Sequence, residues 1–327
     1  MIIFVFTSSD KRISWNEHTL CKPKPERIAQ MSTWNPTVKV RKNAIAFLYS
    51  DQVQKLVPKI SLLDIQFQDN LSADIVIFHT DYPVKAHMQA IASVTKRQVI
   101  FYNVDDAFTS FPKGFDPYLE EPNWMKRGKW NYQHMCRFWF KLIMDIPLVL
   151  EYKYVMRLDE DSKIIGAWDD IFDLMGKKNA VYFGNVEEAD SENGLPGLMK
   201  LKTFTINYTE SYQLIPKNPK RLIRAFDIPN HIRLYNTNFD VIKVDFFRRS
   251  EIRHWTDAVD ATHGIFKYRW GDHVLRYLTT ALFATPAELS DEICFNVLFY
   301  LPDIKNYLQE KLTQVLRDNS ILLQCTL

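Results

Sequence analysis

Three apolar runs of strand length, separated by two segments with helical spacing, constrain the fold of this chain more than any other feature. The runs are 44–49 (AIAFLY), 75–78 (IVIF) and 98–102 (QVIFY), and segments 51–63 and 83–95 lie between them. Continuous apolar runs are typical of strands that are buried on both faces of a sheet. Strands that alternate with helices predict an α/β fold with a mixed, mainly parallel sheet flanked by helices, and such sheets bind ligands at the carboxyl ends of their strands.

The middle of the chain continues this pattern toward an acidic segment. A loop rich in proline and aromatic residues spans 105–129. Apolar residues from Tyr132 to Ile143 share one face of a helix that must end before Pro147. Residues 148–158 then predict a central strand that runs directly into acidic residues.

The length of 327 residues allows one large α/β domain or two smaller ones. Residues 1–42 contain three prolines and show little periodicity, which predicts an N-terminal arm. No linker divides the remainder, and its weakest point, 189–197, could equally be an active-site loop. We therefore expect a single domain over residues 43–327.

The composition argues against several functional classes. The net charge is +2, with 41 basic and 39 acidic residues, so we expect no nucleic-acid partner. The sequence has no glycine-rich phosphate-binding motif, no Gly-x-Ser-x-Gly motif and no paired histidines, which disfavours dehydrogenases, NTPases, serine hydrolases and zinc proteases. No apolar run approaches the roughly 20 residues that span a bilayer, and no secretory signal is convincing. We therefore expect no transmembrane segment and a cytoplasmic location.

The first segment that carries chemistry is 156–161 (MRLDED), which follows the predicted central strand. Asp159 and Asp161 are two residues apart, so in an extended chain their carboxylates project to the same side and can share one divalent cation. A polar loop with solvated acids is the alternative interpretation. The position just after a buried strand favours the metal site, because α/β sheets present their ligand sites there.

Two further segments have roles that the residues alone leave open. Segment 235–240 (YNTNFD) can hold the Asp240 carboxylate near a reacting sugar, although a turn explains it more simply. In segment 268–272 (YRWGD), Asp272 is placed to cap the helix that follows it. Trp270 can be a core residue or a sugar-stacking face, and Arg269 can pair with a phosphate or with a structural acid.

These segments, in this order, resemble the fungal α-1,2-mannosyltransferase family over roughly residues 43–283. Four blocks carry the resemblance: 132–138 (YQHMCRF), 152–159 (YKYVMRLD), 238–240 (NFD) with 245–248 (DFFR), and 269–272 (RWGD). The resemblance implies a GT-A type nucleotide-sugar-binding fold and a retaining glycosyltransferase of the Golgi. Such an enzyme moves mannose from GDP-mannose onto a glycan acceptor with Mn²⁺ (or Mg²⁺) as cofactor.

The resemblance also implies roles for single residues. Asp159 matches the family's acidic metal ligand, and Tyr132 matches a tyrosine of its active site. Asp240 matches a glutamate that acts as the nucleophile or supports the oxocarbenium-like transition state. The remaining substrate-binding residues are Arg157, expected to orient the acids or contact phosphate, and Arg269, Trp270 and Asp272, which match a segment that borders the sugar.

The chain departs from the family pattern in three ways. The family's metal-binding histidine has no counterpart after His273, so Asp161 is expected to supply the second ligand. Asp240 is one methylene shorter than glutamate, which leaves open a front-face mechanism without a covalent intermediate. The family's membrane anchor is not recognised, and the Golgi lumen is the family-based alternative to the cytoplasm. Another nucleotide sugar, or a catalytically silent sugar-nucleotide or glycan-binding protein, remains an alternative function.

Overall fold

The computed structural model describes residues 42–80, 83, 85–119, 130–162, 166–184, 186–191 and 196–289. Apart from Lys42, the predicted N-terminal arm lies outside these residues. Residues 290–327 of the predicted 43–327 domain also lie outside them. Both boundaries therefore stay predictions.

The described part of the chain is built on a six-stranded sheet with the strand order β3-β2-β1-β4-β8-β5. The strands β3, β2, β1 and β4 are parallel, and β8 runs antiparallel to both β4 and β5. The predicted mixed, mainly parallel sheet is confirmed. The strands are β1 (Asn43–Leu48), β2 (Asp74–His79), β3 (Val99–Asn103), β4 (Tyr154–Leu158), β5 (Tyr182–Gly184) and β8 (Phe239–Lys243).

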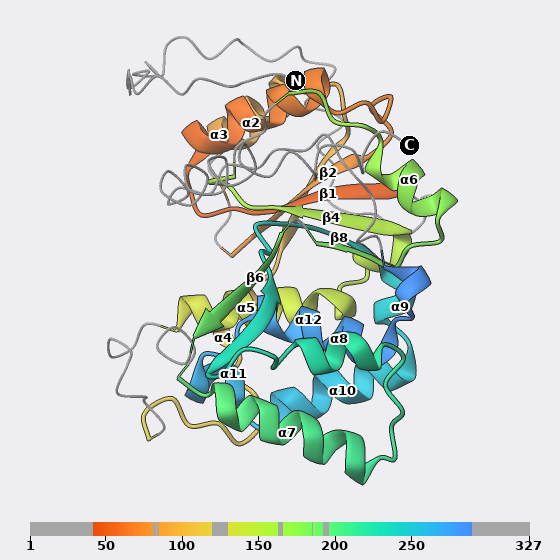
Figure 1. Cartoon of the computed structure of the whole chain (residues 1–327). Coiled ribbons are helices and arrows are strands. Elements are labelled where there is room, and N and C mark those ends of the chain that lie inside the picture. The colour runs from red at the N-terminus through yellow and green to blue at the C-terminus, as the bar shows by residue number, and fades with distance from the viewer. Residues whose placement is uncertain are drawn as a thin grey trace, which may run out of the picture.

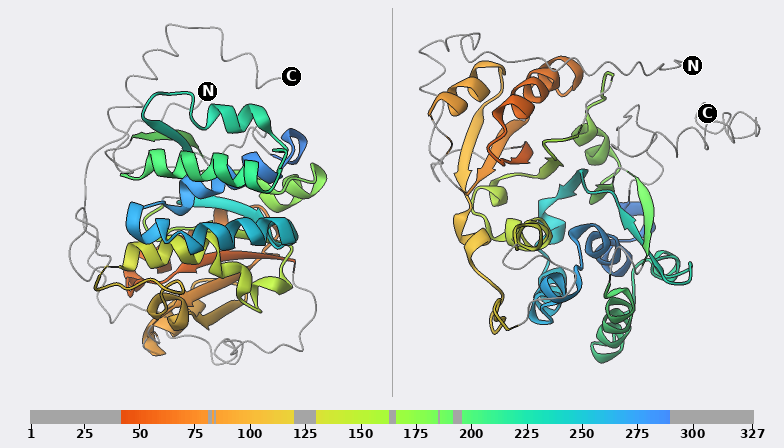
Figure 2. Two further views of the ribbon diagram at one scale, coloured as in Figure 1. Left: turned by 90° about the horizontal axis from the view of Figure 1, so that it is seen from below. Right: turned by 90° about the vertical axis from the view of Figure 1, so that its left-hand side faces the viewer.

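Helices cover both faces of this sheet, as the layers in Figure 1 show. Helices α2 (Val53–Gln66), α3 (Lys85–Ser93) and α6 (Ile171–Lys177) lie on one face. The opposite face carries a thicker helical layer, in which several helices run roughly alongside one another when seen from below (Figure 2, left). That layer comprises α4 (Asp105–Thr109), α5 (Asn131–Phe140), α7 (Leu198–Ser211), α8 (Pro219–Arg224), α9 (Val244–Phe247), α10 (Ser250–Ala261), α11 (Gly264–Tyr268) and α12 (Asp272–Phe283).

The two-sided burial explains why the strands are apolar without alternation. In β1, Ile45 and Phe47 pack into the core under α2 and α3, whereas Ala44 and Ala46 pack into the core under α5 and α12. Successive side chains of a strand point to opposite faces, so both sets must be apolar when both faces are covered.

The structure corrects the predicted strand over 148–158. Only Tyr154–Leu158 forms β4, and the apolar residues before it form short 3-10 turns, Leu142–Asp145 and Val149–Glu151. Leu148 and Val149 are buried, so their apolar character reflects core packing rather than strand pairing. A further 3-10 turn, Pro286–Glu288, follows α12.

A two-stranded antiparallel ribbon, unpredicted from the sequence, stands beside the main sheet (Figure 1). It pairs β6 (Glu187–Ser191) with β7 (His231–Tyr235), and β7 packs against α12. Among the described residues, no helix is both long enough and apolar enough to cross a membrane.

Candidate active site

Two adjoining cavities open at the carboxyl ends of the parallel strands. The larger, of about 870 Å³, is lined by residues that follow β1, β2, β3 and β4 and by the start of α5. The smaller, of about 370 Å³, lies between the end of β4, the β6–β7 ribbon and the start of α12. Tyr132, Met135 and Asp159 line both cavities, so these residues mark the junction between them.

Four buried charged side chains of alternating sign lie between the sheet and α12. Arg157 on β4 and Asp240 on β8 are register partners, so they project from neighbouring strands toward the same face. On α12, Asp272 and Arg276 are four residues apart and share the helix face that meets them. Each charge therefore has an opposite charge nearby, which is the condition under which burial of charged groups is tolerated.

Arg157 links the end of β4 to the start of α12. Its Nε and Nη2 donate to the two oxygens of Asp159 at 2.8 and 3.1 Å, and its Nη1 donates to Asp272 at 2.5 Å. The guanidinium also lies 4.7 Å from the ring centroid of Trp139. Burial raises the pKa of Asp159, although the positive charge of Arg157 acts to lower it. Burial acts to raise the pKa of Asp272, but Arg157 together with neighbouring groups, among them the hydroxyl of Thr237, keeps that pKa below its ordinary value.

The predicted metal ligands lie on a tight turn rather than on an extended segment. The amide of Ser162 donates to the carbonyl of Asp159 at 3.0 Å, which folds residues 159–162 back on themselves. Asp159 and Asp161 nevertheless both line the larger cavity. Two anchors hold the turn: Glu160 accepts from the amide of Ser50 at 3.0 Å, and the ammonium of Lys59 donates to the carbonyl of Ser162.

The donor set of this turn fits a divalent cation that a diphosphate helps to hold. The described residues contain no group of three or more His, Cys, Asp or Glu side chains that could bind a metal by themselves. Mg²⁺-type sites, however, often use one or two carboxylates and take their remaining oxygens from phosphates and water. Each Asp159 oxygen keeps a lone pair beyond the one it offers to Arg157, and Asp161 lines the same cavity.

Tyr132 lies at the junction of the cavities, and Arg269, which lines neither cavity, stacks on its ring. Tyr132 is the second residue of α5 and is 37% exposed, and the guanidinium of Arg269 lies 5.3 Å from its ring centroid. Burial raises the pKa of the Tyr132 hydroxyl, so this group stays protonated and can donate a hydrogen bond. Asp272 is the first residue of α12 and lines the smaller cavity, whereas the residue at the N-cap position is Gly271.

Trp270 lies in the core rather than on a cavity wall. It is 2% exposed, and its Nε1 donates to the carbonyl of Gly197 at 3.0 Å. A Cβ atom on Gly264 would lie 2.1 Å from the Trp270 ring. The indole therefore fixes the backbone just before Asp272 from within the core.

We expect Gly264→Ala to lower the free energy of unfolding by about 1–3 kcal/mol, because the added methyl group overpacks the Trp270 ring. Gly176→Ala is the matched control, since a Cβ on this helical glycine meets nothing within 4 Å. It should leave stability unchanged or raise it slightly. Denaturant titration of both variants measures the difference, and equal unfolding midpoints would contradict the packing described for Trp270.

Asp240 lies below the cavities rather than in their walls. It is 5% exposed, is not among the residues that line either cavity, and lies 4.0 Å from Arg276. Burial raises its pKa to about 6, although Arg276 and Arg157 act in the opposite direction. The structure thus brings Asp240 into the charged cluster, in which Arg157 and Asp272 line the smaller cavity and Asp240 does not.

The raised pKa of Asp240 predicts a pH-dependent effect of Asp240→Asn. A carboxyl whose pKa is higher in the folded state than its ordinary 3.8 makes stability fall as the pH rises through that interval, here from about 4 to about 6. The variant lacks this contribution. Its unfolding free energy relative to the unmodified protein should therefore improve by up to about 3 kcal/mol between pH 4 and pH 7. A difference that stays constant across this range would show that Asp240 has an ordinary pKa.

The sequence interpretation missed the ribbon side of the site. Glu188, Asp190 and Asn236 line the smaller cavity, and Lys59 anchors the acidic turn from within α2. Glu188 and Asp190 have the same spacing as Asp159 and Asp161, and they too follow a short apolar run, 180–183 (AVYF), so the sequence did contain a signal for this side of the site. Segment 189–197, considered as an active-site loop, does contribute residues 189 and 190 to this cavity.

The fold is similar to those of solved fungal mannosyltransferases. Core-mannan synthase A (CmsA/Ktr4) from Aspergillus fumigatus, in its Mn/GDP form, superposes with a TM-score of 0.64 at 18% identity, covering 83% of this chain and 80% of that chain. The mannosyltransferase Ktr4p from Saccharomyces cerevisiae gives a TM-score of 0.65 at 21% identity, covering 89% and 82%. The predicted GT-A type fold is confirmed.

The relatives found by sequence comparison are also named mannosyltransferases. The probable mannosyltransferase KTR3 of Saccharomyces cerevisiae is 26% identical over 253 residues, which are 72% of this chain and 60% of the relative. The O-glycoside alpha-1,2-mannosyltransferase omh1 of Schizosaccharomyces pombe is 23% identical over 267 residues, which are 78% and 68%. The chain thus spans about three fifths to two thirds of the length of these relatives.

The similarity to these relatives corrects the expected cytoplasmic location. The matching relatives are mannosyltransferases of the fungal type that the resemblance above places in the Golgi lumen. The cytoplasmic location is therefore wrong. It rested only on features that the sequence was found to lack.

Most of the sequence also matches a family profile. The profile described as glycolipid 2-alpha-mannosyltransferase matches residues 7–302, which is most of the chain and includes every residue of the two cavities. The protein therefore belongs to the glycolipid 2-alpha-mannosyltransferase family.

Proposed function

We propose that this protein is a metal-dependent, retaining mannosyltransferase that transfers mannose from GDP-mannose to a glycan acceptor. Family membership supports the reaction class, and a structural neighbour in an Mn/GDP form supports the nucleotide and the metal. The observation that carries the proposal is the charge of the larger cavity, because it explains how a diphosphate can be bound there only together with a cation.

The larger cavity has the position and size of a nucleotide site. Its volume of about 870 Å³ lies in the usual range of roughly 300–1,000 Å³ for small-molecule sites. Among the described residues that line it, Lys55 is the one Lys or Arg. Five carboxylates share the lining, those of Asp51, Asp105, Asp159, Glu160 and Asp161. Such a surface repels a diphosphate on its own and attracts a divalent cation that the diphosphate can share.

Asp159 and Asp161 would hold this cation, for the reasons of position and donor type given above. When bound, Mn²⁺ or Mg²⁺ would neutralise the charge that grows on the leaving diphosphate. Arg157 keeps Asp159 and Asp272 in place, and Lys55 is positioned to contact a phosphate. Trp270 acts indirectly, by fixing the backbone that carries Arg269 and Asp272.

At the junction, the protonated hydroxyl of Tyr132 can donate to a sugar or phosphate oxygen, with Arg269 stacked on its ring. Asp272 faces the smaller cavity as an ionised carboxylate and can stabilise positive charge at the anomeric carbon. Asp240 would support the same charge from below, by balancing Arg276 and Arg157. Its position beneath the cavity floor favours a front-face reaction, in which the acceptor hydroxyl attacks on the side of the departing diphosphate.

A panel of donors tests this proposal. The purified protein with Mn²⁺ is offered GDP-mannose, GDP-fucose, UDP-glucose and UDP-galactose, with and without methyl α-mannoside, and products are identified by mass spectrometry. We expect consumption of GDP-mannose, a mannosyl disaccharide, and loss of both on adding EDTA. If the protein prefers another donor, the reaction class stands and the proposed donor, GDP-mannose, is wrong. A melting temperature raised by GDP and Mn²⁺ without consumption of any donor would indicate a silent binding protein.

A further inference from the structure

The smaller cavity adjoins the proposed nucleotide site and opens into it. The two share Tyr132, Met135 and Asp159, and a diphosphate held at the acidic turn would direct its sugar toward this junction. The space beyond the junction, of about 370 Å³, is at the lower end of the range for small-molecule sites. A second substrate that attacks the sugar must approach through this space.

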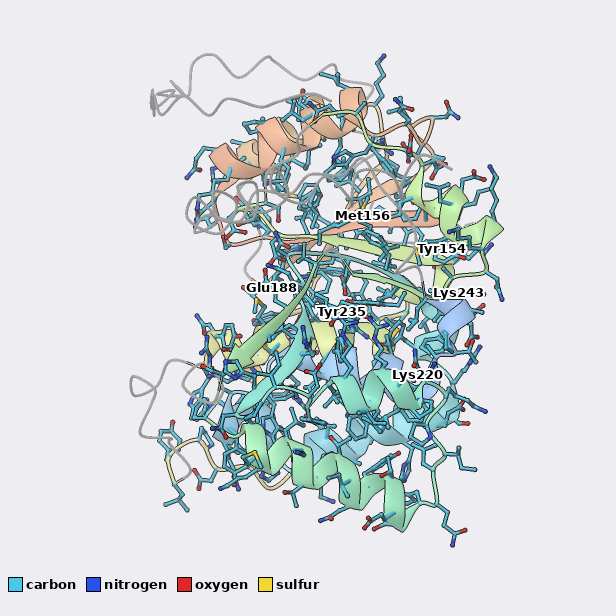
Figure 3. All side chains as sticks on the ribbon, viewed as in Figure 1. Tyr154, Met156, Glu188, Lys220, Tyr235 and Lys243 are labelled. Atoms are coloured by element: carbon cyan, nitrogen blue, oxygen red, sulfur yellow. The ribbon has the colours of Figure 1, made fainter. Side chains whose placement is uncertain are left out.

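One wall of the smaller cavity is the β6–β7 ribbon. Along β6, Glu188 and Asp190 are two residues apart and therefore share the face that lines the cavity. Glu187 projects to the other face, where it pairs with Arg224 at 2.9 Å. Figure 3 shows that β4 runs from Tyr154 through Met156 toward the side of the sheet on which Glu188 lies.

The charges of this cavity select against anions. Among the described residues that line it, Arg157 is the one Lys or Arg, and its guanidinium is already bonded to both Asp159 and Asp272. His273, the histidine of the lining, has its pKa lowered by burial and adds no fixed positive charge. Four carboxylates remain, those of Asp159, Glu188, Asp190 and Asp272.

The polar groups of the ribbon suit hydroxyl donors. Carboxylates accept hydrogen bonds and donate none, and hydrogen bonds to charged groups are among the stronger ones. The backbone and side chains of Asn236, Thr237 and Asn238 add further donors and acceptors along the same wall, and Leu234, Tyr235 and Met135 add apolar surface. Vicinal hydroxyls above an apolar ring face are the pattern that an uncharged pyranoside presents.

We infer that the smaller cavity is the acceptor subsite of this enzyme, that Glu188 and Asp190 bind hydroxyl groups of an uncharged sugar there, and that acceptors carrying a phosphate group are rejected. The inference rests on the proposed function, because it takes the larger cavity as the donor site. It adds a pair of acceptor-binding residues and a chemical limit on the acceptor.

The test compares Glu188→Gln and Asp190→Asn with Asp227→Asn. Asp227 pairs with Arg233 of the same ribbon at 3.2 Å and lies outside the cavity, so it controls for a general disturbance of β7. Each cavity variant should raise the KM for methyl α-mannoside about 10-fold or more, since a hydrogen bond to a charged group is weakened. The Kd of GDP in the presence of Mn²⁺ should not change. The control should change neither quantity by more than about 2-fold.

The charge limit is tested with a second acceptor. The unmodified protein should use methyl α-mannoside at least about 10-fold better than its 6-phosphate, and the Glu188→Gln, Asp190→Asn double variant should narrow this preference. Unchanged acceptor KM values in both single variants, or equal use of the phosphorylated acceptor, would overturn the inference.

A binding measurement keeps the inference separate from the proposed function. If no donor is consumed, saturation-transfer NMR on the protein with GDP and Mn²⁺ still compares the binding of the two mannosides. Binding of the uncharged mannoside that both cavity variants weaken would support the subsite even where turnover fails. Binding that the variants leave intact would refute it.

Discussion

Arg157→Met is expected to lower the rate of mannosyl transfer by about 100-fold or more. Arg157 is 4% exposed and is bonded to both Asp159 and Asp272, so one substitution releases the acidic turn and the carboxylate at the smaller cavity together. Displacement of reacting groups by about 1 Å already costs rates of this order. The variant also removes the cation that balances these carboxylates, which should lower the free energy of unfolding by about 3–5 kcal/mol.

Two further variants separate the loss of geometry from the loss of folding. Arg157→Lys keeps the charge but cannot bridge two carboxylates with a planar fork, so it should fold better than Arg157→Met and still lose most activity. Arg253→Met removes an arginine that pairs with the exposed Asp145 at 2.5 Å, and it should cost at most about 1 kcal/mol and little activity. Steady-state rates and urea titrations give both quantities. Near-normal turnover in Arg157→Lys would show that the bridge does not position the site.

Asp159→Asn and Asp161→Asn are each expected to raise the Mn²⁺ concentration needed for half-maximal activity by about 100-fold or more. A neutral amide is a weaker ligand than a carboxylate, and the proposed cation would supply several kcal/mol of transition-state stabilisation. Asp161→Asn gives the cleaner result, because Asp159→Asn also disturbs Arg157. The metal titration should be repeated with GDP alone by calorimetry, which reports binding without turnover.

Asp51→Asn is the matched control for the two proposed metal ligands. Asp51 lines the same cavity and has a φ of 63°, a left-handed conformation that asparagine also adopts readily. For the Asp51→Asn variant, the Mn²⁺ concentration needed for half-maximal activity should stay within about 3-fold of that of the unmodified protein. This is expected for a carboxylate that does not bind the metal directly. A normal Mn²⁺ requirement in both Asp159→Asn and Asp161→Asn would remove the metal assignment.

The sequence predicts the sheet well where local pattern and tertiary structure agree. The runs at 44–49, 75–78 and 98–102 became β1, β2 and β3 because both faces of these strands are buried. The predicted strand began too early, at residue 148. Residues 148 and 149 are apolar because they are buried in the core at a 3-10 turn, and not because they belong to a strand. The β6–β7 ribbon was missed because β6 is short and polar and pairs with β7 across about 40 residues of sequence.

The same distinction applies to the site. Asp159, Asp161, Arg157, Tyr132 and Asp272 meet at the carboxyl ends of the strands, where the α/β pattern places ligand sites. Whether a side chain faces a cavity or the core depends on contacts that are distant in the sequence. Trp270 is held in the core by Gly197 and Gly264, and Asp240 is covered by α12. Neither contact leaves a signal in the residues next to them.

The most direct test of the account is the transfer reaction itself, followed by NMR. The protein is incubated with GDP-mannose, methyl α-mannoside and Mn²⁺, and the anomeric signals of the product are compared with those from a parallel reaction containing EDTA. We predict an α-linked mannosyl disaccharide, formed together with GDP, that is absent when the metal is removed. Equal product formation with EDTA, or a β-linked product, would contradict a metal-dependent, retaining mannosyltransferase.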